Sequence, residues 1–340
     1  MTKADVLLGV LWLGLTLYTL FGGADYGAGM WHLVAGRTGR AGRLRDLVEH
    51  TIGPVWEANH VWLIFVIVLF WTGFPSAFAA FSATLYIPLT LVALGVIGRG
   101  AAFAFRKATD VPWQQRAYGL VFGISSVLTP FFLGTVAGAV ASGRVPPGIG
   151  TGDTVGSWLN PTSVYCGLLA VGSCGYLAGV YLTGDAARDG ADKLTEAFRR
   201  RSLGAGLAVG VVALAGLGIL RGDAPELVHG LTHRGLPAVL VSVLAGSASI
   251  ALLLRRRYLP ARVTAAVTVA ALLWGWGAAQ YPVLLYPDLT VAAASAQPTV
   301  LSATLGVLAV SAVLLIPALV WLLVLFQRGS RDTGAARPPS

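Results

Sequence analysis

The class of fold can be inferred from residues 5–33, which read DVLLGVLWLGLTLYTLFGGADYGAGMWHL. The stretch is apolar over more than the about 20 residues that cross the hydrocarbon core of a bilayer as a helix, so it predicts a membrane span. Four glycines surround Asp25 within it: Gly22, Gly23, Gly27 and Gly29. Such a cluster predicts a kink or a close approach of another backbone. Because the run is too long for the apolar core of a cleavable signal peptide, we expect this helix to remain in the mature protein.

The composition extends the membrane interpretation to the whole chain. Of its 340 residues, 56% are hydrophobic and 11% are charged, whereas a soluble domain carries about 25% charged residues. The mean hydropathy is +0.73. These values exclude a water-soluble fold and indicate an all-α, polytopic membrane protein. We predict nine transmembrane helices, over residues 5–33, 53–73, 76–104, 116–141, 162–183, 203–220, 236–254, 262–280 and 301–326.

The basic residues predict how these helices are oriented. The formal net charge is +9, and nineteen of the 24 lysines and arginines fall on one side of the predicted membrane, against four on the other side. Because positively charged loops stay in the cytoplasm, we expect the N-terminus outside and the C-terminus in the cytoplasm. Residues 328–340 are expected to form a disordered cytoplasmic tail. The charge pattern follows the topology rather than one folded face, so we expect no nucleic acid as a partner.

Four ionisable residues fall inside the predicted spans: Asp25, Glu57, His60 and Arg99. A charge in hydrocarbon is costly, and intramembrane ionisable groups are therefore functional candidates. Counting along each span at about 1.5 Å per residue places all four in the cytoplasmic third of the membrane. The sequence therefore predicts one polar cluster near the inner surface.

Residues 56–62, WEANHVW, give the second span a polar face. Glu57 and His60 are three residues apart and therefore lie on one side of a helix. A carboxylate beside an imidazole, with Asp25 on a neighbouring helix, is typical of a route that carries protons into a membrane. The alternative interpretation is structural. In that case Arg99 neutralises Asp25 or Glu57, and the buried ion pair holds three helices together.

The sequence offers little for binding a metal or a haem by this chain alone. Cys166 and Cys174 are the only cysteines, and they form no C-x-x-C pair. His60 is the one histidine plainly inside a span, so no pair of axial haem ligands is visible. His229 and His233 have the i, i+4 spacing of two ligands on one helix face, but no third ligand is indicated. We expect no metal site, and redox chemistry would depend on the ligands of a partner.

Five motifs, in chain order, resemble subunit II of the cytochrome bd-type quinol oxidases, including the cyanide-insensitive branch. They extend over nearly the whole chain. The motifs are FGGADYGAG at 21–29, GPVWEANHVW at 53–62, FP at 74–75 followed by YIP at 86–88, RGAAFAFR at 99–106, and GWGAAQYP at 275–282 with Pro317 downstream.

The resemblance implies a fold and a partner. The fold would be two four-helix bundles plus one peripheral helix. Residues 1–142 would form the first bundle, 143–282 the second, and 283–327 an outer loop and the ninth helix. The partner would be subunit I, which carries haem b, haem d and the quinol site. The complex of this family oxidises quinol, reduces dioxygen to water with protons from the cytoplasm, and generates a membrane potential without pumping. Subunit II is associated with proton delivery and oxygen access.

The resemblance also suggests roles for single residues. Asp25 and Glu57 match the family's carboxylates of proton delivery, and His60 joins them in the predicted pathway through its spacing. Structural or charge-pairing roles are expected for four residues: Arg99, Asn59, Trp56 and Trp62. An outer-side motif contains Trp276, Gln280 and Tyr281.

The expected location is the cytoplasmic membrane of a prokaryotic cell, with quinol and dioxygen as substrates of the complex. The family leaves room for a small single-helix accessory subunit and for a structurally bound quinone or lipid. Two other functions compete with this interpretation. One is a secondary transporter of a small solute with Asp25 in a broken helix as its coupling carboxylate, and the other is a scaffold that only stabilises subunit I. An oxidase subunit would co-purify with a coloured, haem-bearing partner, whereas a transporter would be colourless.

Overall fold

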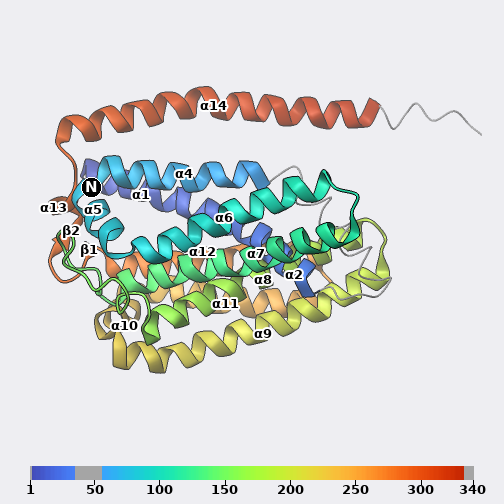
Figure 1. The fold of residues 1–340 in the computed structure, drawn as a ribbon, viewed down its shortest axis with the longest axis horizontal. Coiled ribbons are helices and arrows are strands. Elements are labelled where there is room, and N and C mark those ends of the chain that lie inside the picture. Colours follow the sequence, from blue (N-terminus) through green and yellow to red (C-terminus); the bar gives the residue numbers. More distant parts are fainter. Residues whose placement is uncertain (1, 35–55, 333–340) are drawn as a thin grey trace, which may run out of the picture.

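The computed structural model describes residues 2–34 and 56–332. Long helices run side by side along one direction, and the short elements gather at one end (Figure 1). The elements of the first half are α1 (Lys3–Leu17), the π-helix η1 (Tyr18–Gly22), α2 (Gly23–Val34), α4 (Trp56–Gly73), α5 (Pro75–Thr84), α6 (Tyr86–Lys107) and α7 (Pro112–Ala141). Those of the second half are α8 (Pro161–Arg188), α9 (Asp192–Asp223), α10 (Pro225–Thr232), α11 (Leu236–Leu254), α12 (Tyr258–Gln280), β1 (Val283–Leu285), β2 (Leu289–Thr290), α13 (Val291–Ala294) and α14 (Pro298–Asp332).

The helices have the length and composition of membrane spans. Within the described residues, eight helices are long and apolar enough to cross a bilayer. A further pair, Asn59–Gly73 and Pro75–Thr84, passes the same test only when taken together, and it is bent by 118°. The predicted all-α membrane fold is therefore confirmed. The count reaches nine if the bent pair is one span.

The prediction for the third span, 76–104, is wrong at its beginning. Residues 75–84 form the separate short helix α5, and the long helix α6 begins only at Tyr86. Phe74 leaves the helical conformation between α4 and α5, with φ −136° and ψ 61°, and Pro75 follows it. A proline at the first position of a helix has no N–H to continue the helix before it. Because α5 is as apolar as the spans, hydropathy alone did not separate it from α6.

The helix that contains the predicted span 203–220 is longer than the span. Helix α9 begins eleven residues earlier, at Asp192. Its first turns carry charges that a hydropathy pattern excludes, yet these charges pair along the helix. Glu196 accepts hydrogen bonds from Arg199 and Arg200, three and four residues further on. Such i, i+3 and i, i+4 pairs stabilise a helix whose residues are not apolar.

The first span contains a π-helical turn and two close backbone approaches. The turn, Tyr18–Gly22, lies between α1 and α2. A Cβ atom added to Gly27 would overlap the carbonyl oxygen of Cys174 on α8, and one added to Gly29 would overlap Ser126 Oγ on α7. The predicted close approach is therefore confirmed, because only a glycine lets α2 pack so tightly between α7 and α8.

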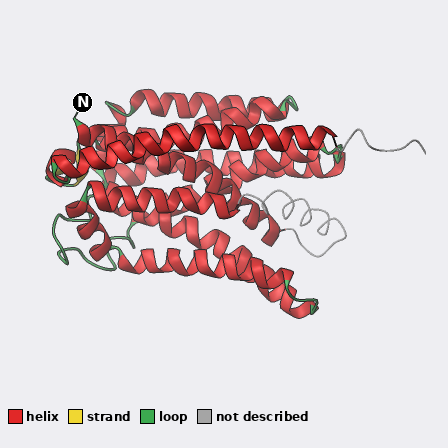
Figure 2. Cartoon of the chain, turned by 90° about the horizontal axis from the view of Figure 1, so that it is seen from above, coloured by secondary structure: helices red, strands yellow, loops and turns green. Residues whose placement is uncertain are grey.

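The outer loop and the surface agree with a membrane environment. The loop after α12 folds into the antiparallel pair β1–β2, and it packs against the protein with Leu285, Val291 and Ala294 buried. Helix α14 runs along the edge of the bundle (Figure 1), and the perpendicular view also shows the helices side by side (Figure 2). Large apolar side chains remain exposed along α9 and α14, including Leu214 at 71% and Val313 at 71%. Such a surface is stable against acyl chains rather than water.

Candidate functional site

Asp25 and Arg99 form a buried ion pair between α2 and α6. Arg99 Nη1 donates to Asp25 Oδ2 over 2.6 Å, and Arg99 Nη2 donates to Asp25 Oδ1 over 2.7 Å. Nη2 also donates to the Asp25 carbonyl oxygen at 3.1 Å. Asp25 is 7% exposed and Arg99 is 2% exposed. This fork geometry is the strongest arrangement of a guanidinium with a carboxylate, and it cancels both charges inside the protein.

Arg99 is also held from the side of α7. Its Nε donates to Ser126 Oγ at 3.1 Å, and the Ser126 hydroxyl donates to the Phe122 carbonyl oxygen at 2.7 Å. The guanidinium carbon lies 4.8 Å from the centre of the Tyr26 ring and 4.7 Å from that of Phe122. Both distances are those of cation–π contacts. The Arg99 side chain therefore joins α2, α6 and α7 at one point.

Two buried phenol groups lie beside this ion pair. The hydroxyls of Tyr18, in η1, and Tyr26, in α2, are 3.2 Å apart, and either one donates to the other. Both residues pack with Met30 and Cys174, and Trp62 of α4 packs against the same cluster. Trp62, a predicted structural residue, therefore lies near the ion pair.

Helix α4 contributes the remaining residues of the predicted cluster. Asn59 is buried, with 4% of its surface exposed, and its Nδ2 donates to the Phe21 carbonyl oxygen of η1 at 3.4 Å. His60 follows on the same helix and is partly buried. Helix α4 begins at Trp56, and the side chains of Trp56 and Glu57 lie outside the described part of the structure. The places of Glu57 and of His60 in the cluster stay predictions.

The structure adds a part-buried histidine–arginine contact that the sequence did not predict. His32 follows the glycine cluster near the end of the first span and would be expected in solvent, but it is only 5% exposed. Its Nε2 lies 2.7 Å from Arg106 Nη1, and the ring of Phe122 covers it edge-on at 5.9 Å. His32 and Arg106 each follow a member of the Asp25–Arg99 pair by seven residues, or two helical turns. This shared spacing is the feature of the sequence from which the His32–Arg106 contact could have been predicted.

Trp276, Gln280 and Tyr281, the predicted outer-side motif, form a hydrogen-bonded cap. It lies at the end of the bundle away from the His32–Arg106 contact. Trp276 Nε1 donates to Gln280 Oε1 at 2.7 Å, and Gln280 Nε2 donates to the Leu284 carbonyl oxygen at 2.8 Å. The Tyr281 hydroxyl donates to Asp5 Oδ1 at 3.2 Å. The nearby Asp5 carboxylate raises the pKa of Tyr281, first through its negative charge and then by accepting a hydrogen bond from the protonated hydroxyl. The motif therefore fastens the outer loop to α12 and to the start of α1.

The side chains that could hold a metal ion do not gather at one place in the described residues. No group of three or more His, Cys, Asp or Glu side chains in this part of the chain is placed to hold a metal ion. His229 and His233 stack on each other, with ring centres 4.1 Å apart. In α2, His32 contacts Arg106, and Met30 packs into the tyrosine cluster.

Comparisons with known proteins agree with this architecture. Residues 4–326 match the family model described as cytochrome bd terminal oxidase subunit II. The cytochrome bd ubiquinol oxidase subunit 2 of Bacillus subtilis (strain 168) is 33% identical over 131 residues, which are 38% of this chain and 37% of that relative. The putative cytochrome bd menaquinol oxidase subunit II of the same organism is 22% identical over 348 residues, and the match covers 97% of each chain.

A solved structure extends the agreement to the fold. One chain of the bd oxidase from Geobacillus thermodenitrificans superimposes with a TM-score of 0.75 at 27% identity, and the match covers 96% of this chain and 99% of that chain. None of these similarities supports the alternative of a secondary transporter. The family match over residues 4–326, the relatives and the shared fold lead to one conclusion: the chain belongs to the family of subunit II of the cytochrome bd terminal oxidases.

Proposed function

We propose that this chain assembles with a haem-bearing subunit I and supplies part of the path by which protons reach the site of dioxygen reduction. Asp25, Glu57 and His60 form the segment of that path in subunit II, and Arg99 holds Asp25 in place. Haem b, haem d and quinol bind to the partner. The same helices offer an apolar route for dioxygen, and the resulting reaction generates a membrane potential without pumping.

The single observation that carries this proposal is the burial of the Asp25–Arg99 pair. A carboxylate and a guanidinium, each less than one-tenth exposed, sit among apolar helices. Intramembrane charges are expensive and mark ion or proton routes by default. Polar groups continue from the pair in one direction, since His32 and Arg106 lie about 10 Å further along α2 and α6. A line of titratable groups and bound water can carry protons where hydrocarbon cannot.

The proposed orientation of the chain in the membrane indicates which end of this line of polar groups faces the cytoplasm. The end of the bundle that contains Arg106 also holds the start of α9 and the loop between α11 and α12, both rich in arginine. By the positive-inside rule this end faces the cytoplasm. The His32–Arg106 contact then lies between the cytoplasm and the Asp25–Arg99 pair, as a proton entrance requires. The division into bundles over 1–142 and 143–282, with a ninth helix over 283–327, is part of the same proposal.

The test is oxygen consumption by the purified complex with its partner. Asp25→Asn and Glu57→Gln should each slow turnover per haem at least about tenfold, the usual contribution of a positioned proton-transfer group being about 10²–10⁴, while the haem spectrum is unchanged. Asp153→Asn is the matched control. That carboxylate lies in the loop 142–160 and accepts hydrogen bonds from the backbone N–H groups of Val155 and Gly156.

The outcomes separate this proposal from the scaffold alternative. If Asp25→Asn lowers the yield of assembled complex but leaves turnover per haem unchanged, the ion pair is structural. Normal oxygen consumption in both variants would contradict the proton route. A loss that appears equally in Asp153→Asn would show a general effect of removing a carboxylate.

A further inference from the structure

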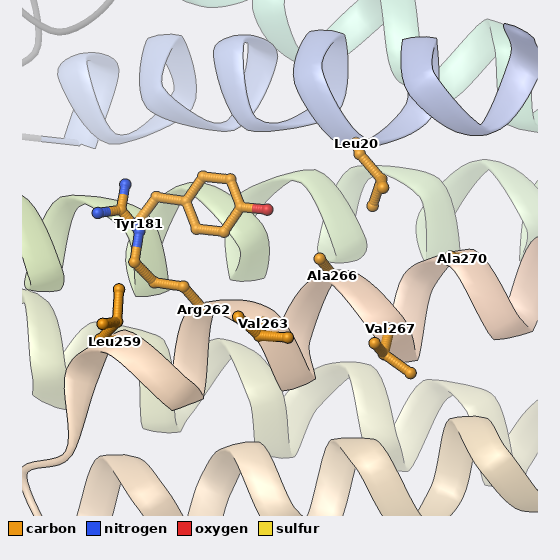
Figure 3. A pocket seen from close by; sticks show the side chains of 8 residues that line it. All are labelled: Leu20, Tyr181, Leu259, Arg262, Val263, Ala266, Val267 and Ala270. Carbon is orange, nitrogen blue, oxygen red and sulfur yellow. The ribbon is translucent and has the colours of Figure 1, made fainter. Parts of the chain in front are cut away.

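A groove runs along α12 near the arginine-rich end of the bundle. It has a volume of about 440 Å³ and is lined by Leu20 of η1, Tyr181 of α8 and six residues of α12 between Leu259 and Ala270 (Figure 3). The lining is almost entirely apolar. The groove opens sideways, because Leu259 and Val263 on its edge are 74% and 61% exposed. A molecule dissolved in the bilayer can enter it directly.

We propose that this groove holds one acyl chain of an anionic phospholipid, whose phosphate lies against the arginines at the mouth. The dimensions fit an acyl chain. Leu259 and Ala270 are eleven residues apart, so the groove follows α12 for about 16 Å. Half of a hydrocarbon core of about 30 Å is one leaflet. The groove therefore has the depth of one leaflet and begins where α12 begins, at the proposed cytoplasmic surface.

The polar groups of the groove gather at its mouth. Tyr181 and Arg262 are the two lining residues with polar side chains. The Arg262 guanidinium lies 5.0 Å from the centre of the Tyr181 ring, and its Nη1 donates to Asp185 Oδ1 at 3.0 Å. These contacts fix the guanidinium at the groove while its side chain stays 23% exposed. It is positioned to meet a charged group and still reach solvent.

The chain just before the groove adds more positive charge. Arg255, Arg256 and Arg257 form the exposed loop between α11 and α12, and Arg257 is two residues from Leu259. Among the described residues, the nearby carboxylates are already shared with other arginines. Asp185 is shared between Arg188 and Arg262. Glu196 lies 3.7 Å from Arg256 and is already bonded to Arg199 and Arg200.

The positive charge at the mouth of the groove favours an anionic phospholipid as its occupant. Basic pockets between transmembrane helices on the cytoplasmic side bind anionic headgroups, and each basic residue near the surface contributes about 1 kcal/mol. The N-terminus of α12 faces the same mouth and adds its partial positive charge. A quinone would fill the apolar part, but its neutral head does not account for four arginines within residues 255–262.

The experiment measures which lipids stay with the purified complex. The complex with subunit I is incubated in mixed micelles with equal amounts of phosphatidylglycerol and phosphatidylcholine and then washed. The bound phospholipid and quinone per haem are quantified by mass spectrometry. Ala266→Trp fills the groove. Ala270→Phe is a second groove-filling variant with a smaller side chain. Val243→Trp is the control, because it introduces the same indole side chain on α11 at a position that is 59% exposed and outside the groove.

We expect the groove-filling variants to lose one phosphatidylglycerol per complex, whereas Val243→Trp retains it. Arg262→Gln should lower the preference for phosphatidylglycerol about fivefold, the equivalent of about 1 kcal/mol, and Arg262→Lys should restore most of it. Equal retention of both lipids by the unaltered complex would overturn the proposal. So would release of a quinone instead of a phospholipid from Ala266→Trp, or unchanged lipid content in both groove-filling variants.

Discussion

Removing one member of the Asp25–Arg99 pair should strongly destabilise the protein, because the charge of the other member stays buried. Arg99→Met deletes three bonds to Asp25 and one to Ser126, and it leaves a carboxylate that is 7% exposed without its cation. Breaking a buried pair from one side costs about 3–5 kcal/mol. Asp25→Asn keeps the shape of the side chain but leaves the guanidinium uncompensated, so we expect a cost in the same range.

The double variant Asp25→Asn with Arg99→Met should recover part of this loss. Neither residue then carries a charge, and replacing a buried ion pair by neutral groups is often close to neutral in stability. We expect a coupling free energy of about 2–3 kcal/mol between the two sites, the upper range for residues in direct contact. The assay is thermal unfolding of the purified complex in one detergent, followed through the haem absorbance and the far-UV helix signal.

An exposed arginine provides the control. Arg200 donates to Glu196 at 3.0 Å but is 77% exposed, so Arg200→Met should cost no more than about 0.5 kcal/mol, as exposed helix pairs do. If the Asp25 and Arg99 variants each cost less than about 1 kcal/mol, or if their effects simply add, the pair behaves like a surface contact and the reasoning from burial is refuted.

Three further predictions concern packing and the outer cap. Gly27→Ala should cost about 1–3 kcal/mol of stability because its Cβ overlaps the α8 backbone. The control Gly210→Ala has nothing within 4 Å of the added Cβ and should be neutral or stabilising by up to about 1 kcal/mol. Equal melting temperatures of the two variants would contradict the close approach at Gly27. Gln280→Leu should cost about 1–3 kcal/mol and speed cleavage of the loop 281–297 by proteinase K, since it leaves the part-buried indole N–H of Trp276 and the Leu284 carbonyl without their partner. An unchanged cleavage rate would refute the role of the cap. Ser126→Ala should cost about 1–3 kcal/mol, because Arg99 Nε loses its acceptor, and unaltered thermal unfolding would refute it.

The sequence was sufficient to predict the membrane fold because hydrocarbon imposes a strong requirement for length and apolarity. It did not place the ends of all helices. Helix α5 is apolar but only ten residues long, so the bend of 118° before it depends on a proline and on packing that hydropathy does not contain. The start of α9 depends on charge pairs in water, which a search for apolar runs ignores.

The site was predicted in part. Depth along the spans brought Asp25 and Arg99 to one level, and the structure joins them directly. The sequence left open whether Arg99 pairs with Asp25 or with Glu57, because it does not contain the rotation of each helix about its own axis. The position of His32 near the end of a span does not predict its burial. Its burial depends on Phe122 of α7, a contact between helices far apart in the chain.

The π-helical turn at Tyr18–Gly22 has a geometric consequence for the rest of the first span. One additional residue in a helical turn rotates everything after it by about 100° relative to an uninterrupted helix. The carboxylate of Asp25 meets the guanidinium of α6, and Gly27 meets the α8 backbone, only with that rotation in place. Deleting a single residue such as Leu20 would straighten the turn, direct the carboxylate elsewhere and leave the guanidinium facing an empty side of its neighbour, without altering any charged residue.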